Sequence, residues 1–102
     1  MVEKMYVVYG RMELFLPYCR SLKDKRKIIN SIADRIRKRF NISILEVDYH
    51  DLWQRTALGF AAAASREREA DFLASIVRET AENADASLEI TGFMVEVIPY
   101  GR

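Results

Sequence analysis

The stretch MYVVYGRMELFL, residues 5–16, decides the fold because its apolar residues alternate along the whole segment. One alternate set is almost wholly apolar, and the other mixes apolar, polar and charged side chains. The first set is Tyr6, Val8, Gly10, Met12, Leu14 and Leu16, and the second is Met5, Val7, Tyr9, Arg11, Glu13 and Phe15. Successive side chains of a strand point to opposite faces of its sheet, so the pattern predicts a long strand with one face on a core. Pro17 ends this strand.

The next segment, SLKDKRKIINSIADRIRKRF at residues 21–40, has the spacing of a helix. Ser21 stands in the N-cap position, with Asp24 three residues later in the position of a capping box. Apolar residues then recur on one stripe: Ile29, Ile32, Ala33, Ile36 and Phe40. We expect Asn41 to close the helix. Lys25 also falls on the stripe, so we expect its stem to follow the sheet edge and its ammonium to reach water.

The middle of the chain predicts two strands joined by a polar loop. The β-branched run ISILEV, residues 42–47, is typical of a strand, and DYHDLWQR, residues 48–55, is typical of a connection. The alanine content of residues 56–64 favours a helix, but large and small residues alternate there. We therefore predict a strand, and we expect its small side chains to let helices pack closely on the sheet.

A second helix is expected after Ser65, its predicted N-cap, with acidic residues in the first turn where the helix dipole favours them. Its predicted buried stripe is Ala70, Leu73, Ile76, Val77, Thr80, Ala81 and Ala84. Residues 87–98 predict a last strand, with Gly92 at a bulge. The order strand, helix, strand, strand, helix, strand is the ferredoxin-like βαββαβ pattern. We therefore predict an α+β fold with two helices on one face of a four-stranded antiparallel sheet.

Length and composition indicate one domain spanning residues 1–102, with half of its residues apolar and 30% charged. The single Cys19 excludes an internal disulfide and a multi-cysteine metal site. The sequence has no signal-like leader and no apolar run of the roughly 20 residues that a membrane helix needs. We expect a cytoplasmic protein that does not associate with membranes.

Positive charge is concentrated in the first predicted helix. Between Arg20 and Arg39, nine basic and two acidic residues give a net charge of +7, and the chain total of +1 leaves −6 for the remaining residues. The basic side chains expected to point away from the apolar stripe are Lys23, Arg26, Lys27, Arg37 and Lys38. Such a surface can follow the phosphates of a nucleic acid. The alternative is a solvated face that acids elsewhere in the chain balance.

The loop at residues 48–55 offers aromatic and polar groups suited to RNA. Tyr49 and Trp53 can stack on bases, and Gln54 and Arg55 can bond to base edges or phosphates. The alternatives are that Trp53 packs back onto the sheet and that Arg55 pairs with a carboxylate. The types of residue at Asp48, His50 and Asp51 also suit a metal, and a small metal-dependent enzyme using His50 with one of these acids is a further hypothesis.

No pattern of catalytic residues is present in the chain. The flanking Arg20 and Lys23 would lower the pKa of Cys19 if its thiol were exposed, but a structural cysteine is the better interpretation. The four glycines, Gly10, Gly59, Gly92 and Gly101, form no phosphate-binding loop. We therefore expect no enzymatic activity, no catalytic residues, no cofactor and no bound metal.

The predicted sheet face opposite the helices is too apolar to remain fully exposed, because it carries Met5, Val7, Tyr9 and Phe15. We expect a dimer or higher homo-oligomer that covers part of this face or the edge strand at residues 42–47.

Two motifs resemble those of the YlxP-like family, a small bacterial family catalogued as domain of unknown function 503. They are SLKDKR at residues 21–26, followed by FNIS at residues 40–43, and DLWQR at residues 51–55. The resemblance covers essentially the whole chain and is weakest in its C-terminal third. It implies a ferredoxin-like fold and a strand at residues 56–64. It brings no assigned enzymatic activity, and the neighbourhood of family genes to translation genes implies a link to RNA.

Taken together, the basic helix and the aromatic loop predict a non-enzymatic RNA- or ribosome-associated binding protein. The rival hypothesis is a homo-oligomeric protein-interaction module that does not bind nucleic acid.

Overall fold

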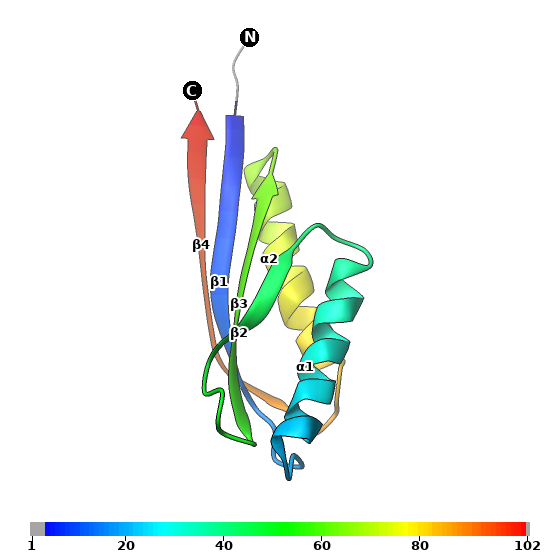
Figure 1. The fold of residues 1–102 in the computed structure, drawn as a ribbon. Coiled ribbons are helices and arrows are strands. Elements are labelled where there is room, and N and C mark those ends of the chain that lie inside the picture. Colours follow the sequence, from blue (N-terminus) through cyan, green and yellow to red (C-terminus); the bar gives the residue numbers. More distant parts are fainter. Residues whose placement is uncertain (1–3, 102) are drawn as a thin grey trace.

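The computed structural model describes residues 4–101, which form the ferredoxin-like fold predicted from the sequence (Figure 1). Its elements are β1 (Lys4–Phe15), α1 (Leu22–Arg37), β2 (Ser43–Asp48), β3 (Arg55–Ala64), α2 (Glu67–Glu82) and β4 (Glu89–Gly101). Every predicted helix and strand is present, including the strand predicted for residues 56–64. The last strand extends farther than expected, to Gly101.

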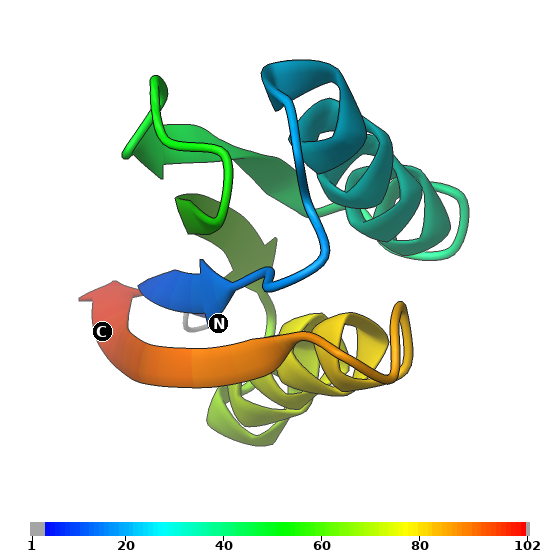
Figure 2. The same ribbon diagram turned by 90° about the horizontal axis from the view of Figure 1, so that it is seen from below.

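The four strands form one antiparallel sheet in the order β2-β3-β1-β4. The prediction that the strand at residues 5–16 is central is confirmed, because β1 lies between β3 and β4. Both helices cover the same face of the sheet and leave the other face open (Figure 2). Neither α1 nor α2 has the length and apolar character that crossing a bilayer requires.

The core lies between the sheet and the two helices. Val8, Met12 and Leu14 from the apolar set of β1 are buried there, together with Ile32 and Ile36 of α1. The alternation along β1 therefore predicted the core-facing side correctly, because the strand keeps its period of two along its whole length.

The small residues of β3 lie on the side opposite to the one expected. Met12 pairs with Leu58, so the large residues of β3 face the helices, while Ala57, Gly59 and Ala61 face the open side of the sheet. Large side chains are needed under the helices to fill the core. The small residues instead make room for open-face side chains, since Val47 Cγ1 lies 2.7 Å from where a Cβ of Gly59 would stand.

Gly10 makes room for a neighbouring ring of the core, and Gly92 lies at a bulge of the sheet. At Gly10, a Cβ atom would lie only 2.5 Å from Phe60 Cζ, so the absence of a side chain makes room for the Phe60 ring. The bulge predicted at Gly92 is confirmed, because the register between β1 and β4 shifts where Glu13 pairs with Gly92 and Leu14 pairs with Ile90.

The cap predicted for α1 is confirmed, and the cap predicted for α2 is wrong. Ser21 Oγ accepts a hydrogen bond from Asp24 N at 3.0 Å, as an N-cap side chain does. The residue before α2 is Arg66, which makes no side-chain cap, and Ser65 Oγ instead bonds to Glu69 Oε2 at 3.3 Å. A one-residue difference in where the helix begins thus takes the Ser65 hydroxyl away from the cap position.

The end predicted for α1 is also wrong. The helix ends at Arg37, and its C-cap is Lys38 in the right-handed region. Phe40 N still bonds to Ile36 O at 2.9 Å, so a short turn follows the helix. Asn41 is not needed as a cap because this turn closes without a left-handed residue.

Lys25 is the largest departure from the predicted fold. Its side chain is 1% exposed, and its ammonium does not reach water. Lys25 Nζ donates to three backbone oxygens and pairs with Glu46 Oε2 at 2.9 Å. The three oxygens belong to Tyr49 at 2.8 Å, His50 at 3.2 Å and Arg55 at 3.3 Å. The first turn of α1 is therefore fastened to the loop between β2 and β3.

We predict that Lys25→Met destabilises the protein by about 3–5 kcal/mol, because it removes the cation paired with Glu46 and leaves the loop carbonyls without their donor. Urea unfolding measures the change. The matched control is Lys23→Met, two residues away on the exposed side, which should change stability by no more than about 0.5 kcal/mol. Equal effects of the two substitutions would show that the buried ammonium does not hold the loop.

Candidate nucleic-acid interface

The two sequence motifs lie together at one end of the molecule, where hydrogen bonds connect them. Besides the Lys25 contacts, Gln54 Nε2 donates to Pro17 O at 3.0 Å and to Cys19 O at 3.3 Å. Leu16 N donates to Gln54 O at 2.8 Å. These bonds fix the loop before α1 against the loop between β2 and β3, so the polar parts of both motifs are largely structural.

This motif end presents two exposed aromatic rings. Trp53 is 54% exposed and Tyr18 is 76% exposed, so a large part of each ring is open to solvent. Trp53 also lines a shallow pocket of about 470 Å³ whose wall includes Phe15 and Leu52. Exposed rings of this kind offer a surface on which unpaired bases can stack.

The other two predicted residues of the loop, Tyr49 and Arg55, engage each other on the open face of the sheet. Tyr49 has a φ of 62°, in the left-handed region, and its hydroxyl donates to Glu13 Oε1 at 2.8 Å. Arg55 lies over the Tyr49 ring with Cζ 4.1 Å from the centroid, and Arg55 also approaches Glu13 at 3.7 Å. Arg55 thus pairs with a carboxylate, as the alternative interpretation expected, and it covers one side of the Tyr49 ring.

Glu13 is the centre of this polar cluster. Its carboxylate also pairs with Arg11 at 3.1 Å, and Arg11 in turn pairs with Asp48 at 3.2 Å. The hydrogen bond from Tyr49, followed by that from Arg11, lowers the pKa of Glu13. The cluster contains two positive groups, Arg11 and Arg55, and two negative groups, Glu13 and Asp48. Its charges therefore balance within the sheet face.

The predicted basic residues lie on three sides of α1. Lys23 and Lys27 face away from the sheet, whereas Arg26 and Arg37 flank the edge of β2. Arg37 donates from its guanidinium to Ile44 O at 2.6 Å, which occupies one backbone acceptor of that strand. Lys38 lies at the groove between the two helices.

The structure therefore does not bring all predicted site residues together. Lys23, Arg26, Lys27, Arg37 and Lys38 belong to the helical layer, whereas Tyr49 and Arg55 lie on the opposite face of the sheet. Trp53 lies at the motif end, where it lines the same shallow pocket as Phe15 and Arg55. The candidate surface thus consists of α1 and the motif end, and Tyr49 lies apart from it on the open face.

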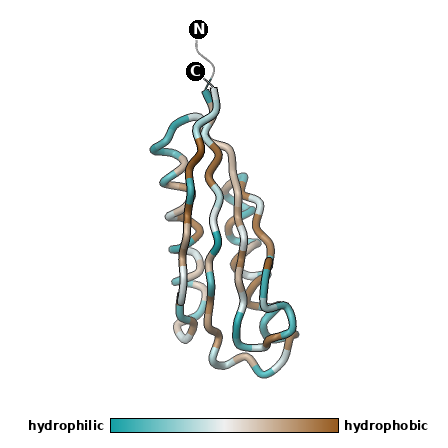
Figure 3. The backbone as a smooth tube through the Cα atoms, turned by 90° about the vertical axis from the view of Figure 1, so that its left-hand side faces the viewer, coloured by the Kyte–Doolittle hydropathy of each residue, from teal (hydrophilic) through white to brown (hydrophobic). Residues whose placement is uncertain are grey.

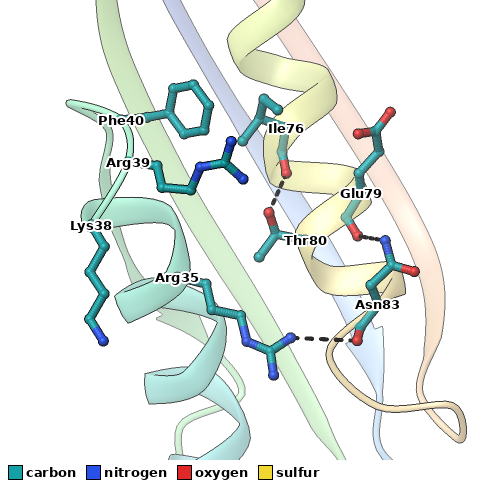
Figure 4. A pocket seen from close by; sticks show the side chains of 8 residues that line it. All are labelled: Arg35, Lys38, Arg39, Phe40, Ile76, Glu79, Thr80 and Asn83. Atoms are coloured by element: carbon teal, nitrogen blue, oxygen red, sulfur yellow. Dashed lines mark hydrogen bonds between the residues drawn. The ribbon is translucent and has the colours of Figure 1, made fainter.

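Two further basic residues were missed by the sequence analysis. Arg35 and Arg39 extend from the C-terminal end of α1 toward α2 and line a groove of about 440 Å³ (Figure 4). They are four residues apart, the helical spacing of neighbours on one side. The sequence contains that spacing, and it places both residues beside the apolar stripe. The groove could not be recognised from it, because α2 forms the other wall.

Among residues 4–101, Lys25 is the only one of the nine basic residues of the segment that forms an ion pair. The acids that could have balanced the others have partners elsewhere: Glu13 and Asp48 pair on the open face, and Glu82 pairs with Arg78 within α2. The segment therefore keeps most of its positive charge unpaired within this part of the chain.

The remaining candidate groups have structural surroundings. Cys19 is buried, and burial, aided by the charge of Asp24, raises the pKa of its thiol. This agrees with the structural role expected for it. Asp48 accepts from Tyr49 N at 2.7 Å as well as from Arg11. Within residues 4–101, no three His, Cys, Asp or Glu side chains are grouped as a metal ion would need.

We predict that Tyr49→Phe raises the pKa of Glu13, because it removes the donor that contributes most to lowering it. A carboxylate with a depressed pKa stabilises the fold above its ordinary pKa of about 4.3, and that stability is lost as pH falls through the depressed value. Parent and variant should therefore differ in unfolding free energy near neutral pH and converge in acid. NMR titration of the Glu13 carboxyl measures the pKa directly, and an unchanged value would contradict the assignment.

Comparison with known structures supports the fold. A de novo designed protein, Foldit4, superposes with a TM-score of 0.52 at 13% identity, covering 96% of this chain and 98% of the design. A second design, LFR1 1, described as having a ferredoxin fold, gives a TM-score of 0.52 at 15% identity over 87% of this chain and 83% of its own. At these identities the likeness concerns the fold alone.

Comparison with known sequences identifies the family. The uncharacterized protein YlxP of Bacillus subtilis (strain 168) is 49% identical over 45 residues, which are 44% of this chain. The matched stretch spans about half, 49%, of the length of that relative. The sequence model described as "Protein of unknown function (DUF503)" matches residues 7–93, which include both motifs. The chain therefore belongs to the DUF503 family of proteins of unknown function.

Proposed function

We propose that this protein is a non-enzymatic, cytoplasmic binding protein for single-stranded RNA, either free or within the ribosome. The observation that carries the proposal is the unpaired positive charge of the helical layer. Eight of the nine basic residues between Arg20 and Arg39 have no ion-pair partner within residues 4–101. If these basic side chains only kept the helix solvated, acidic side chains of the fold would be expected to pair with them. Several of these acids instead pair with basic residues outside the segment.

The motif end supports RNA rather than a compact anion as the ligand. Trp53 and Tyr18 present exposed rings at the end of the molecule where α1 begins and where the loop between β2 and β3 is fastened to it. Stacking on aromatic side chains requires bases that are not paired, so single strands suit this surface better than duplexes. In this arrangement the phosphates follow α1 from Lys23 toward its C-terminal end, and bases stack at the motif end.

We predict that Lys23→Glu together with Lys27→Glu strongly weakens binding of a single-stranded RNA oligonucleotide, because both side chains face outward and removing them leaves the core intact. Fluorescence anisotropy at low salt measures the affinity. For the parent, the logarithm of affinity should fall with the logarithm of salt concentration by about 0.7 per phosphate contacted. The charge-matched control is Arg66→Glu with Arg68→Glu at the start of α2, where both side chains are exposed. Failure of the parent to bind RNA would refute the proposed function.

The contribution of stacking is tested at the single tryptophan. Trp53→Ala should cost about 1–3 kcal/mol of binding free energy, whereas Trp53→Phe, which keeps an aromatic ring, should cost less. Because Trp53 is the only tryptophan of the chain, quenching of its fluorescence by RNA reports the same contact.

We also propose that copies of the chain associate as a homodimer through the open face of the sheet. Figure 3 views this face and shows hydrophobic stretches along its strands. Its large apolar side chains are 37–61% exposed: Met5, Tyr9, Leu45, Val47, Met94, Ile98 and Tyr100. Burying these side chains against a second copy would remove them from water.

The size of the open face favours a second copy of the chain. Four strands about 4.8 Å apart and about ten residues long present roughly 600 Å². Two such faces together would bury roughly 1,200 Å², which is the lower limit of specific protein interfaces. The helical layers would point outward from this dimer, so RNA binding and association would not compete.

We predict that the parent sediments as a dimer at tens of micromolar and that Met94→Lys with Ile98→Lys shifts it to monomer, since buried unpaired charges would oppose the pairing. Tyr18→Lys, which adds a charge at an exposed ring outside the face, should leave the dimer unchanged. A monomeric parent would contradict this part of the proposal, and the RNA-binding part would stand.

A further inference from the structure

We infer that the shallow pocket at Trp53 binds a guanine base of the bound RNA, with the Asp51 carboxylate accepting hydrogen bonds from the Watson–Crick edge of that base. This inference rests on the proposed RNA-binding function and names the base that the motif end selects. The pocket lies where Phe15, the last residue of β1, pairs in register with Arg55, the first residue of β3.

The walls of the pocket suit a flat aromatic ring. Phe15, Leu52 and Trp53 provide apolar surface, and the volume of about 470 Å³ falls within the range of sites that bind small molecules. Leu52 and Trp53 are both exposed, so each presents surface that a ligand can cover. A nucleobase stacked on the indole ring would remove this apolar surface from water.

The polar groups of the pocket favour a base that brings hydrogen-bond donors. Asp51 lines the pocket, and its carboxylate forms no ion pair and accepts no hydrogen bond within residues 4–101. Arg55 lines the same pocket but pairs with Glu13 instead, at 3.7 Å. Gln54 donates from Nε2 to two backbone oxygens, which leaves its Oε1 as a second acceptor. The acceptors at this pocket therefore lack donors of their own.

Guanine matches a free carboxylate better than the other three bases do. Its Watson–Crick edge carries two adjacent donors, N1–H and the 2-amino group, and the two oxygens of a carboxylate can accept from both. Adenine and cytosine place an acceptor nitrogen beside their amino group, and uracil has one donor between two carbonyl groups. A carboxylate also repels the phosphates of any RNA, so Asp51 favours binding only where hydrogen bonds to a base offset that repulsion.

The backbone that carries the pocket is held in place before a base arrives. Lys25 Nζ donates to the backbone oxygens of His50 and Arg55, at the two ends of the loop segment that lines the pocket. Leu52 N closes a turn of that segment by donating to Tyr49 O at 3.0 Å. Because the loop does not have to be ordered on binding, a single base contact can contribute measurably to affinity.

The test measures how the parent and Asp51→Asn bind two single-stranded RNA oligonucleotides of equal length, one all uridine and one with a central guanosine. We expect the parent to bind the guanosine oligonucleotide about tenfold more tightly, the effect of a charge-assisted hydrogen bond. Asp51→Asn should lose this preference and bind the all-uridine oligonucleotide at least as tightly as the parent, because it removes a negative charge. The charge-matched control is Asp71→Asn, an exposed aspartate of α2 outside the pocket, which should keep the preference.

Two further arms use smaller changes of the ligand. Inosine in place of guanosine removes only the 2-amino group, so the parent should bind that oligonucleotide more weakly, whereas Asp51→Asn should not distinguish the two. Guanosine monophosphate, followed by quenching of Trp53 fluorescence, should bind more weakly than the guanosine oligonucleotide. Equally tight binding of the two ligands would show a site for a free nucleotide and overturn the assignment to RNA.

The outcomes separate this inference from the function on which it rests. A guanosine preference that Asp51→Asn abolishes and Asp71→Asn retains supports it. A parent that binds both oligonucleotides equally, or a preference that Asp51→Asn keeps or that both variants lose, overturns the guanine site and leaves the RNA-binding function intact. A parent that binds neither oligonucleotide overturns both.

Discussion

The buried ammonium of Lys25 is the contact on which the motif end of the molecule depends. When a loop folds against a helix, its inward carbonyl groups need hydrogen-bond donors, because a buried acceptor without a partner costs free energy. Lys25 supplies them for Tyr49, His50 and Arg55, and Glu46 neutralises its charge. With Gln54 holding the preceding loop, the two family motifs become one rigid unit. The exposed position of Trp53 follows from that unit.

The start of α1 therefore combines residues that hold the fold with residues that remain exposed. Ser21, Asp24 and Lys25 cap the helix and fasten the loop, whereas Lys23, Arg26 and Lys27 remain exposed. Helical geometry separates the roles, since residues one or two positions apart point in different directions. Presence in the motif alone does not identify a residue as functional; the direction of its side chain does.

The sequence predicted those features that depend on local periodicity. The alternation in residues 5–16 gave both the strand and its buried side, and the helical stripe around Ile32 and Ile36 gave the packed side of α1. The predictions that failed concern contacts between residues far apart in the sequence. Lys25 looked like a misfit on an apolar stripe because its oxygen partners come from residues 46–55, and the groove at Arg35 and Arg39 exists only once α2 lies beside α1. The Ser65 cap failed for a local reason, since helix boundaries move by a residue at little cost.

The division of the molecule into a charged helical layer and an apolar open face constrains what it can bind. The proposed polyanion would be attracted to α1 by charges that the fold leaves unpaired, and it would find no comparable field on the open face, where the cluster around Glu13 is balanced. The groups on α1 and at the motif end are held by a helix and by a fastened loop, so binding orders side chains without ordering the backbone. Affinity then depends mainly on how many phosphates the rigid surface can reach. The distance of about 21 Å between Lys23 and Arg37, 14 residues at about 1.5 Å each, sets that number through helix length, a property of the fold itself.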